Sequence, residues 1–180
     1  ASRSVPIVEE LVSEDVPVDH LDKRGNSALH LAMSKPKTPA AIVRALAHAA
    51  SDIGLANQEG NTALHLAFLN PCKKESDMME RLDAVLGQMS AQQRDLQNAN
   101  GATALLCAAA HHELVYPAVK ALIEAGVDPN IRSADGKSPL EWAIRRSNTH
   151  LCKKLILFGA TVDEALLQDI DHRLADEILD

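Results

Sequence analysis

One pair of residues in this chain has types and spacing that could support chemistry: a cysteine and a histidine four positions apart, Cys107 and His111. Side chains at positions i and i+4 of a helix lie on the same face, so this pair could bind one metal ion. A structural zinc site needs four ligands, however, and a free cysteine is more often simply buried. An enzyme fragment using Cys107 and His111 is therefore only a remote alternative.

Two other motifs match catalytic or ligand-binding sequences only in part. The His-Glu pair at 112–113 begins like the helix of zinc proteases, but Tyr116 occupies the position of the second zinc-binding histidine. The run Gly-Lys-Ser at 136–138 resembles the end of a phosphate-binding loop, but Ile131 stands where the first glycine is required. We therefore predict that the chain is not an enzyme and binds neither a cofactor nor a metal.

The composition favours helices and excludes several classes of function. Hydrophobic residues make up 46% of the 180 residues but aromatic residues only 2%, and alanine and leucine supply most of the apolar content. Both favour helices, so we expect an all-α fold and no β-sandwich or barrel. A net charge of −7, with no cluster of lysine and arginine, argues against direct nucleic-acid binding. No apolar run is long enough for membrane insertion.

An internal repeat organises the chain. Four segments share a pattern in which Asp, Asn or Ser precedes a glycine by three residues and Ser or Thr follows the same glycine by two. The glycines are Gly25, Gly60, Gly101 and Gly136, at intervals of 35, 41 and 35 residues. This pattern is typical of a tight turn followed by a helix N-cap. The leucine four positions after each glycine is expected to point into the core, and the alanine three positions later to let a neighbouring helix approach closely.

The repeated pattern resembles that of the ankyrin family, whose period is near 33 residues and whose signature is Thr-Pro-Leu-His-x-Ala. The resemblance implies an all-α solenoid of helix-turn-helix repeats connected by β-turn or hairpin loops. It also implies a structural role for the histidines of the motif, His30 and His65, which would bond within and between repeats. The third and fourth repeats depart from the motif, because Leu106 and Glu141 stand at the histidine position.

The resemblance covers the chain as a single domain. Its expected divisions are a partial repeat at 1–21, repeats at 22–56, 57–97, 98–132 and 133–162, and an acidic C-terminal helix at 163–180. The second repeat carries insertions. Seven carboxylates and one arginine give residues 163–180 a net charge of −6, which leaves −1 for residues 1–162. We expect this amphipathic helix to cap the last repeat, and the alternative is that it binds a partner.

Ankyrin stacks bind other proteins through a concave face and the tips of their loops, so we expect a monomeric adaptor or scaffold module with a protein partner. The expected partner-binding residues are Lys23, Arg24, Asn26, Lys35, Gln58, Glu59, Asn61, Leu69, Asn70, Asn100, His111, Asp135, Lys137, Trp142, Arg145 and Arg146. Basic residues concentrate in the first and fourth repeats, so the partner could be a protein segment that carries acidic groups. The lone tryptophan, Trp142, is expected to be half-buried beside Arg145 and Arg146.

Several alternatives remain within this class. A related interpretation is that the chain resembles the inhibitor of kappa-B family, in which an ankyrin stack with an acidic C-terminal end masks a transcription factor. Another is a microbial effector that acts in the cytosol of its host. Three unpaired cysteines, at 72, 107 and 152, are typical of a reducing compartment, here the cytoplasm or nucleus. Asn130 resembles the ankyrin loop asparagine that an asparaginyl hydroxylase modifies, although stabilising the turn is its more common role.

Overall fold

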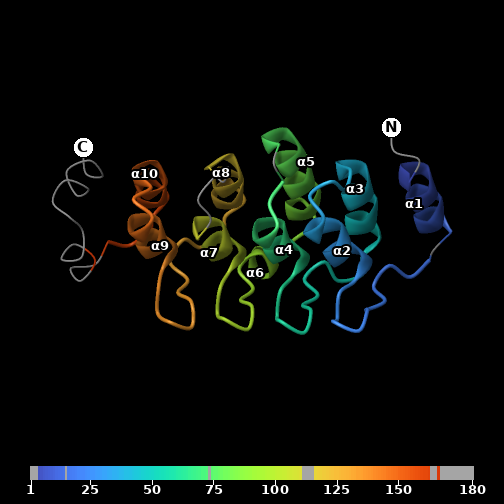
Figure 1. The fold of residues 1–180 in the computed structure, drawn as a ribbon, viewed down its shortest axis with the longest axis horizontal. Coiled ribbons are helices and arrows are strands. Elements are labelled where there is room, and N and C mark those ends of the chain that lie inside the picture. Colours follow the sequence, from blue (N-terminus) through green and yellow to red (C-terminus); the bar gives the residue numbers. More distant parts are fainter. Residues whose placement is uncertain (1–3, 15, 73, 111–115, 163–165, 167–180) are drawn as a thin grey trace.

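The computed structural model describes residues 4–14, 16–72, 74–110, 116–162 and 166. This portion of the chain forms ten helices joined by turns and loops and contains no strand, which confirms the all-α prediction. Figure 1 shows the helices in two rows, with long loops projecting on the opposite side from the upper row. The chain advances along the stack from the N-terminal end to the C-terminal end.

The chain passes back and forth between the two rows of helices. The inner helices, next to the loops, are α2 (Ala28–Ser34), α4 (Ala63–Leu69), α7 (Ala104–Ala109) and α9 (Pro139–Arg145). The outer helices are α1 (Ser4–Ser13), α3 (Ala40–Ala49), α5 (Glu75–Leu86), α8 (Tyr116–Glu124) and α10 (Thr149–Leu157). Inner helices pack on one another in the order α2, α4, α7 and α9, and the outer helices α1, α3, α5 and α8 do the same.

Each inner helix begins where the repeated pattern predicts. Ser27, Thr62, Thr103 and Ser138 have extended backbones at the N-cap positions. The hydroxyl of Thr103 accepts a hydrogen bond from the amide of Leu106, which satisfies one amide that the first turn leaves free. The leucines at the second helical position, Leu29, Leu64, Leu105 and Leu140, are all buried, as predicted.

The loops before the inner helices are tied to one another by backbone hydrogen bonds. The amide of Gln58 donates to the carbonyl of Arg24 over 3.0 Å, and the amide of Ala134 donates in the same way to the carbonyl of Asn100 over 2.9 Å. Between them, the amide of Ala99 donates to Glu59 over 3.0 Å. The four loops therefore form one continuous row at residues 22–26, 57–61, 98–102 and 133–137.

The second repeat contains one helix that the repeated pattern does not predict. Helix α6 (Ala91–Arg94) lies in the segment expected as a long return loop. Ser90 caps it, and the Gln93 side chain accepts from the amide of Ser90 to complete a capping box. The guanidinium of Arg94 then donates to the carbonyls of Leu86 and Ala125, so α6 holds the ends of α5 and α8 together.

At the N-terminal end of the described stack lies an outer helix with no described inner helix before it, and the division into a partial repeat at 1–21 stays a prediction. Helix α1 has no buried residue and packs against the core through Val5, Val8 and Val12. At the other end, the predicted helix at 163–180 lies outside the described residues apart from Leu166, which is buried.

Candidate interaction surface

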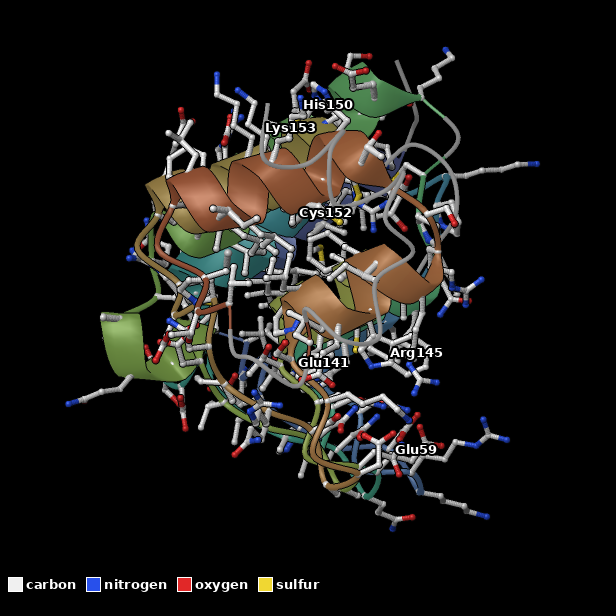
Figure 2. All side chains as sticks on the ribbon, turned by 90° about the vertical axis from the view of Figure 1, so that its left-hand side faces the viewer. Glu59, Glu141, Arg145, His150, Cys152 and Lys153 are labelled. Atoms are coloured by element: carbon white, nitrogen blue, oxygen red, sulfur yellow. The ribbon has the colours of Figure 1, made fainter. Side chains whose placement is uncertain are left out.

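The four loops and the inner helices form one continuous surface, which we call the loop–helix surface. It comprises residues 22–26, 57–61, 98–102 and 133–137 together with the exposed sides of α2, α4, α7 and α9. Figure 2 looks along the stack, with the loops below the helices, and shows Glu59 and Arg145 on the same side of the molecule. Lys153 and His150, on α10, lie at the far edge from the loops.

An apolar pocket of about 440 Å³ lies where the loops of the third and fourth repeats meet the inner helices. Its helix side is lined by Leu69, Leu106, Ala110 and Trp142, and its loop side includes Ala102 and Asp135. The small side chains of Ala102 and Ala110 leave the space open. The pocket therefore places apolar surface inside a polar rim, an arrangement typical of a binding site.

The pocket arises because the third repeat departs from the histidine pattern. In the first two repeats, Nε2 of His30 lies 3.0 Å from the carbonyl oxygen of Asn61, and Nε2 of His65 lies 2.8 Å from that of Ala102. Each ring thus bonds to the next loop, the role that the family resemblance implies. Burial lowers the pKa of both histidines. Leu106 holds the same helical position in α7, is buried, and gives the pocket an apolar wall.

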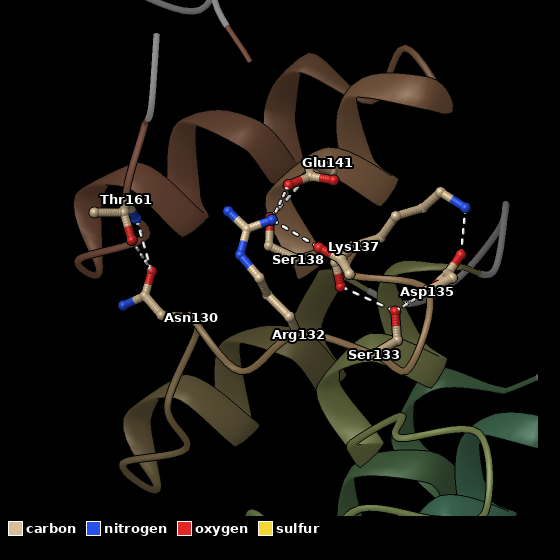
Figure 3. A network of polar contacts seen from close by, with 9 residues as sticks. Asn130, Arg132, Ser133, Asp135, Lys137, Ser138, Glu141 and Thr161 are labelled. Carbon is tan, nitrogen blue, oxygen red and sulfur yellow. Dashed lines mark hydrogen bonds and ion pairs between the residues drawn. The ribbon is translucent and has the colours of Figure 1, made fainter. Parts of the chain in front are cut away.

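A short polar network fixes Trp142 at the edge of the pocket. Lys137 forms an ion pair with Asp135, and its ammonium nitrogen lies over the Trp142 ring, 5.3 Å from the centroid. The hydrogen bonds from Lys137 and Ser133 lower the pKa of Asp135 to about 2, so the carboxylate is charged at neutral pH. Figure 3 shows these partners beside the ion pair between Arg132 and Glu141.

Most of the expected basic residues are exposed. Lys23, Arg24, Lys35 and Arg145 are exposed and Arg146 is half-buried, and none of them makes an ion pair with a described carboxylate. Lys137 differs, because Asp135 neutralises its charge. On the loop–helix surface, the fourth repeat therefore presents two arginines that pair with no described carboxylate, one at the end of α9 and one directly after it.

The remaining expected residues divide into four groups. Those with exposed side chains are Gln58, Glu59, Leu69, Asn70, Asn100 and Asp135, whereas Asn26 and Trp142 are half-buried. Asn61 was expected at an accessible loop tip, and this expectation is wrong. The residue is only 3% exposed; its side chain donates to Glu59 and accepts from the Asn98 side chain over 2.9 Å. It supports the row of loops from within. His111 lies outside the described residues.

Asn130 lies in the loop after α8, at the end of the third repeat. Its Oδ1 accepts hydrogen bonds from the amide and hydroxyl of Thr161, and its Nδ2 donates to the carbonyl of Gly159. Asp95 and Asp19 have the same role at the equivalent positions of earlier repeats, where they accept from the amides of Asp128 and Ser51. At these three positions the side chain therefore links one repeat to the next.

The described cysteines have the character of core residues. Cys107 and Cys152 are buried, and burial raises the pKa of each thiol to about 11, so both are protonated at neutral pH. A protonated thiol is a poor nucleophile and a poor metal ligand. The portion of the chain that the structure describes contains no group of three His, Cys, Asp or Glu residues arranged to hold a metal, and no helix there could span a membrane.

Sequence reasoning identified the rim of the pocket but not the pocket itself. Leu69, Asp135 and Trp142 were expected as contact residues, whereas Ala99 and Leu106 were not. The available indication was the replacement of histidine by Leu106, which removes a polar group from a position that is polar in the two preceding repeats.

Comparison with known proteins places the whole arrangement in one family. The family model described as ankyrin repeats (3 copies) matches residues 1–83 and again residues 75–165. The ankyrin repeat domain of Bcl-3, described as a unique member of the IkappaB protein family, is 25% identical with a TM-score of 0.77 over 98% of this chain and 77% of that one. An ankyrin repeat domain from Acinetobacter baumannii AYE is 24% identical, with a TM-score of 0.73, over 87% and 76%. No curated protein matches the sequence significantly.

Proposed function

The chain belongs to the ankyrin-repeat family, and on that premise we propose that it is a non-catalytic adaptor or scaffold module that binds a protein partner through the loop–helix surface. Ankyrin repeats are in general protein–protein interaction modules. The observation that carries the proposal is the apolar pocket of about 440 Å³ in this surface, with exposed polar side chains around it. The buried, protonated thiols of Cys107 and Cys152 fit a binding rather than a catalytic role.

Site-specific photo-cross-linking tests this proposal. A photoreactive amino acid at Asn100, which is exposed at a loop tip, should form covalent adducts with protein partners in a cell extract. The matched control is the same amino acid at Lys153, which is exposed on α10 at the far edge from the loops (Figure 2). Adducts from position 100 and not from position 153 are the expected result. Equal yields from both positions, or none from position 100, would overturn the proposal.

A second candidate function is masking of a transcription factor in the manner of the inhibitor of kappa-B family. The likeness to the Bcl-3 ankyrin domain over 98% of this chain favours it, together with the net charge of −6 at residues 163–180. The test is an electrophoretic mobility-shift assay with a transcription factor bound to kappa-B-site DNA. Release of the DNA, or a further shift of the complex on adding this protein, is expected, and an unchanged band contradicts this function.

We further propose that the protein acts as a monomer in a reducing compartment, the cytoplasm or nucleus, or the host cytosol if it is a microbial effector. The three free cysteines, all buried, support this proposal because oxidation would disturb the core. Direct binding of nucleic acid is not expected, since the basic residues of the loop–helix surface lie in two separate groups rather than in one stripe.

A further inference from the structure

The apolar pocket has a size and a lining that suit a single bulky side chain from another protein. Its walls are Leu69 at the end of α4, Leu106 in α7 and the half-buried Trp142 in α9. Ala102 and Ala110 keep it open, so no side chain of the described structure fills it. Burial of an apolar group against these walls is favourable in proportion to the area removed from water.

Trp142 is held ready to receive such a group. Lys137 lies over its ring and is in turn held by Asp135, so the ring does not have to be ordered when a ligand binds. Anchors of this kind lose little conformational entropy on binding, which is why tryptophan is frequent among the residues that dominate interfaces.

Two positively charged residues follow the pocket residue Trp142 closely in the sequence. Arg145, the last residue of α9, follows Trp142 by three residues, which places it on the same side of the helix as the ring, and Arg146 is the C-cap residue directly after the helix. The Asp135 carboxylate does not offset them, because it is already paired with Lys137. Neither arginine makes an ion pair with a described carboxylate. The charged groups that directly follow Trp142 and pair with no described carboxylate are therefore two guanidinium groups, which bind carboxylates in a fork geometry.

We infer that the pocket binds an extended segment of the partner protein that carries one bulky apolar residue close to an aspartate or glutamate. The apolar side chain enters between Leu106 and Trp142, and the carboxylate pairs with Arg145 or Arg146. This inference rests on the proposed function and names the chemistry of the segment that the loop–helix surface recognises.

The first test is selection from a library of random twelve-residue peptides displayed on phage, with the full chain as the immobilised target. Enriched peptides are expected to place Leu, Ile, Met or Phe close to Asp or Glu. Enrichment of basic peptides, or no enrichment, overturns the inference.

The second test uses the chain's own fluorescence, because Trp142 is its only tryptophan. Synthetic peptides that lack tryptophan should change the Trp142 emission in a saturable way. Arg145→Glu should weaken their binding by about tenfold or more, since it turns an attraction into a repulsion. The matched control is Lys153→Glu, which changes the net charge equally in the same repeat but at an exposed position on α10, and should leave the affinity within about twofold.

A second variant separates the apolar contact from the charge. Ala110→Leu adds bulk to the pocket wall and should reduce peptide binding while the thermal unfolding midpoint confirms that the protein is folded. Peptides that block cross-linking from position 100 but neither change the Trp142 emission nor respond to Arg145→Glu would overturn this inference and leave the proposed function standing. Absence of adducts from position 100 would instead overturn the proposed function.

Discussion

Arg81 of α5 donates a hydrogen bond from Nη2 to the backbone carbonyl of Ala32 in α2, over 2.8 Å. In a continuing helix that carbonyl would accept from the residue four positions later, but this residue is Pro36, which has no amide hydrogen. The same guanidinium donates to the carbonyl of Met33 and to Sγ of Cys72. Although it is charged, Arg81 is 1% exposed. A buried arginine from the second repeat therefore completes the end of a helix in the first.

Replacing Arg81 with methionine should lower the free energy of unfolding by about 1–3 kcal/mol, because it leaves two buried carbonyls without a donor. Urea denaturation measures the change. Arg44→Met is the matched control: Arg44 is exposed on α3, and its replacement should alter stability by less than about 0.5 kcal/mol. If Arg81→Met is as stable as the wild type, the penalty for burying the charge outweighs the helix-capping contacts.

The closeness of neighbouring loops predicts different effects for two glycine replacements. Gly101 and Gly136 both have positive φ, +68° and +79°, so alanine at either position carries a backbone penalty of about 1 kcal/mol. At Gly101 a Cβ would also lie 2.5 Å from the amide nitrogen of Ala134, whereas at Gly136 nothing lies within 4 Å. Gly101→Ala should therefore be the more destabilising by at least about 1 kcal/mol, because the loops must separate. Equal losses in chemical denaturation would show that adjacent loops are not closely packed.

Acidification should weaken the fold through the two bridging histidines. Burial lowers the pKa of His30 and His65 in the folded protein, whereas in the unfolded chain each pKa lies near 6.5. Below about pH 6.5 the unfolded chain therefore binds more protons than the folded one, and stability falls as the pH drops towards and through the lower folded-state pKa. The urea midpoint at pH 5.5 should be below that at pH 7.5.

His65→Gln should reduce this dependence on pH, because the variant has one fewer group to titrate. His48→Gln is the control, since His48 is exposed on α3. Asp95 has the opposite effect on the pH dependence of stability, because burial raises the pKa of its carboxyl group. Since Asp95 is present in every variant, its effect cancels in the comparison. An unchanged slope in His65→Gln would assign the acid sensitivity to other groups.

Asn130 should stabilise the junction between the last two repeats. Asn130→Ala removes two hydrogen bonds accepted from Thr161 and one donated to Gly159, and should cost about 1–2 kcal/mol in urea denaturation. Asn100→Ala, at an exposed loop tip, should cost less than about 0.5 kcal/mol. A similar effect of the two replacements would assign Asn130 no special role at the junction.

These hydrogen bonds also bear on the resemblance of Asn130 to a hydroxylation site. An enzyme would have to draw the amide away from Thr161 and Gly159 before modifying it, so we expect intact-mass measurement after co-expression with an asparaginyl hydroxylase to show no added oxygen. A species heavier by one oxygen at Asn130 would contradict this expectation.

Much of the fold could be predicted from local chemistry that repeats along the chain. A turn glycine, a hydroxyl N-cap and an inward leucine at fixed offsets led to the start of every inner helix, as at Thr103 and Leu105. These features depend on residues that are close in sequence, so the spacing of those residues is enough to predict where each inner helix begins. Helix α6 was missed because its four residues are too few for apolar periodicity, although Ser90 and Gln93 form a recognisable capping box.

The features that the sequence did not reveal depend on residues from different repeats. Arginine is usually a surface residue, so the sequence gives no sign that Arg81 is buried. The contact with Ala32 explains its burial. Asn61 belongs to a loop tip by position but faces Asn98 of the next loop. Similarly, the apolar pocket requires Leu69, Leu106 and Trp142 from three repeats to meet, and their separations along the chain do not indicate how they are arranged in space.

Three of the hydrogen bonds that join successive loops run between main-chain atoms, from Gln58 to Arg24, from Ala99 to Glu59 and from Ala134 to Asn100. Because every amino acid except proline offers the same amide and carbonyl, the identities of the exposed side chains at these positions have little influence on these three bonds. Mutation can therefore exchange the side chains that meet a partner while the scaffold persists. Such a protein can acquire a new partner gradually, by single replacements, without passing through an unfolded intermediate in its evolution.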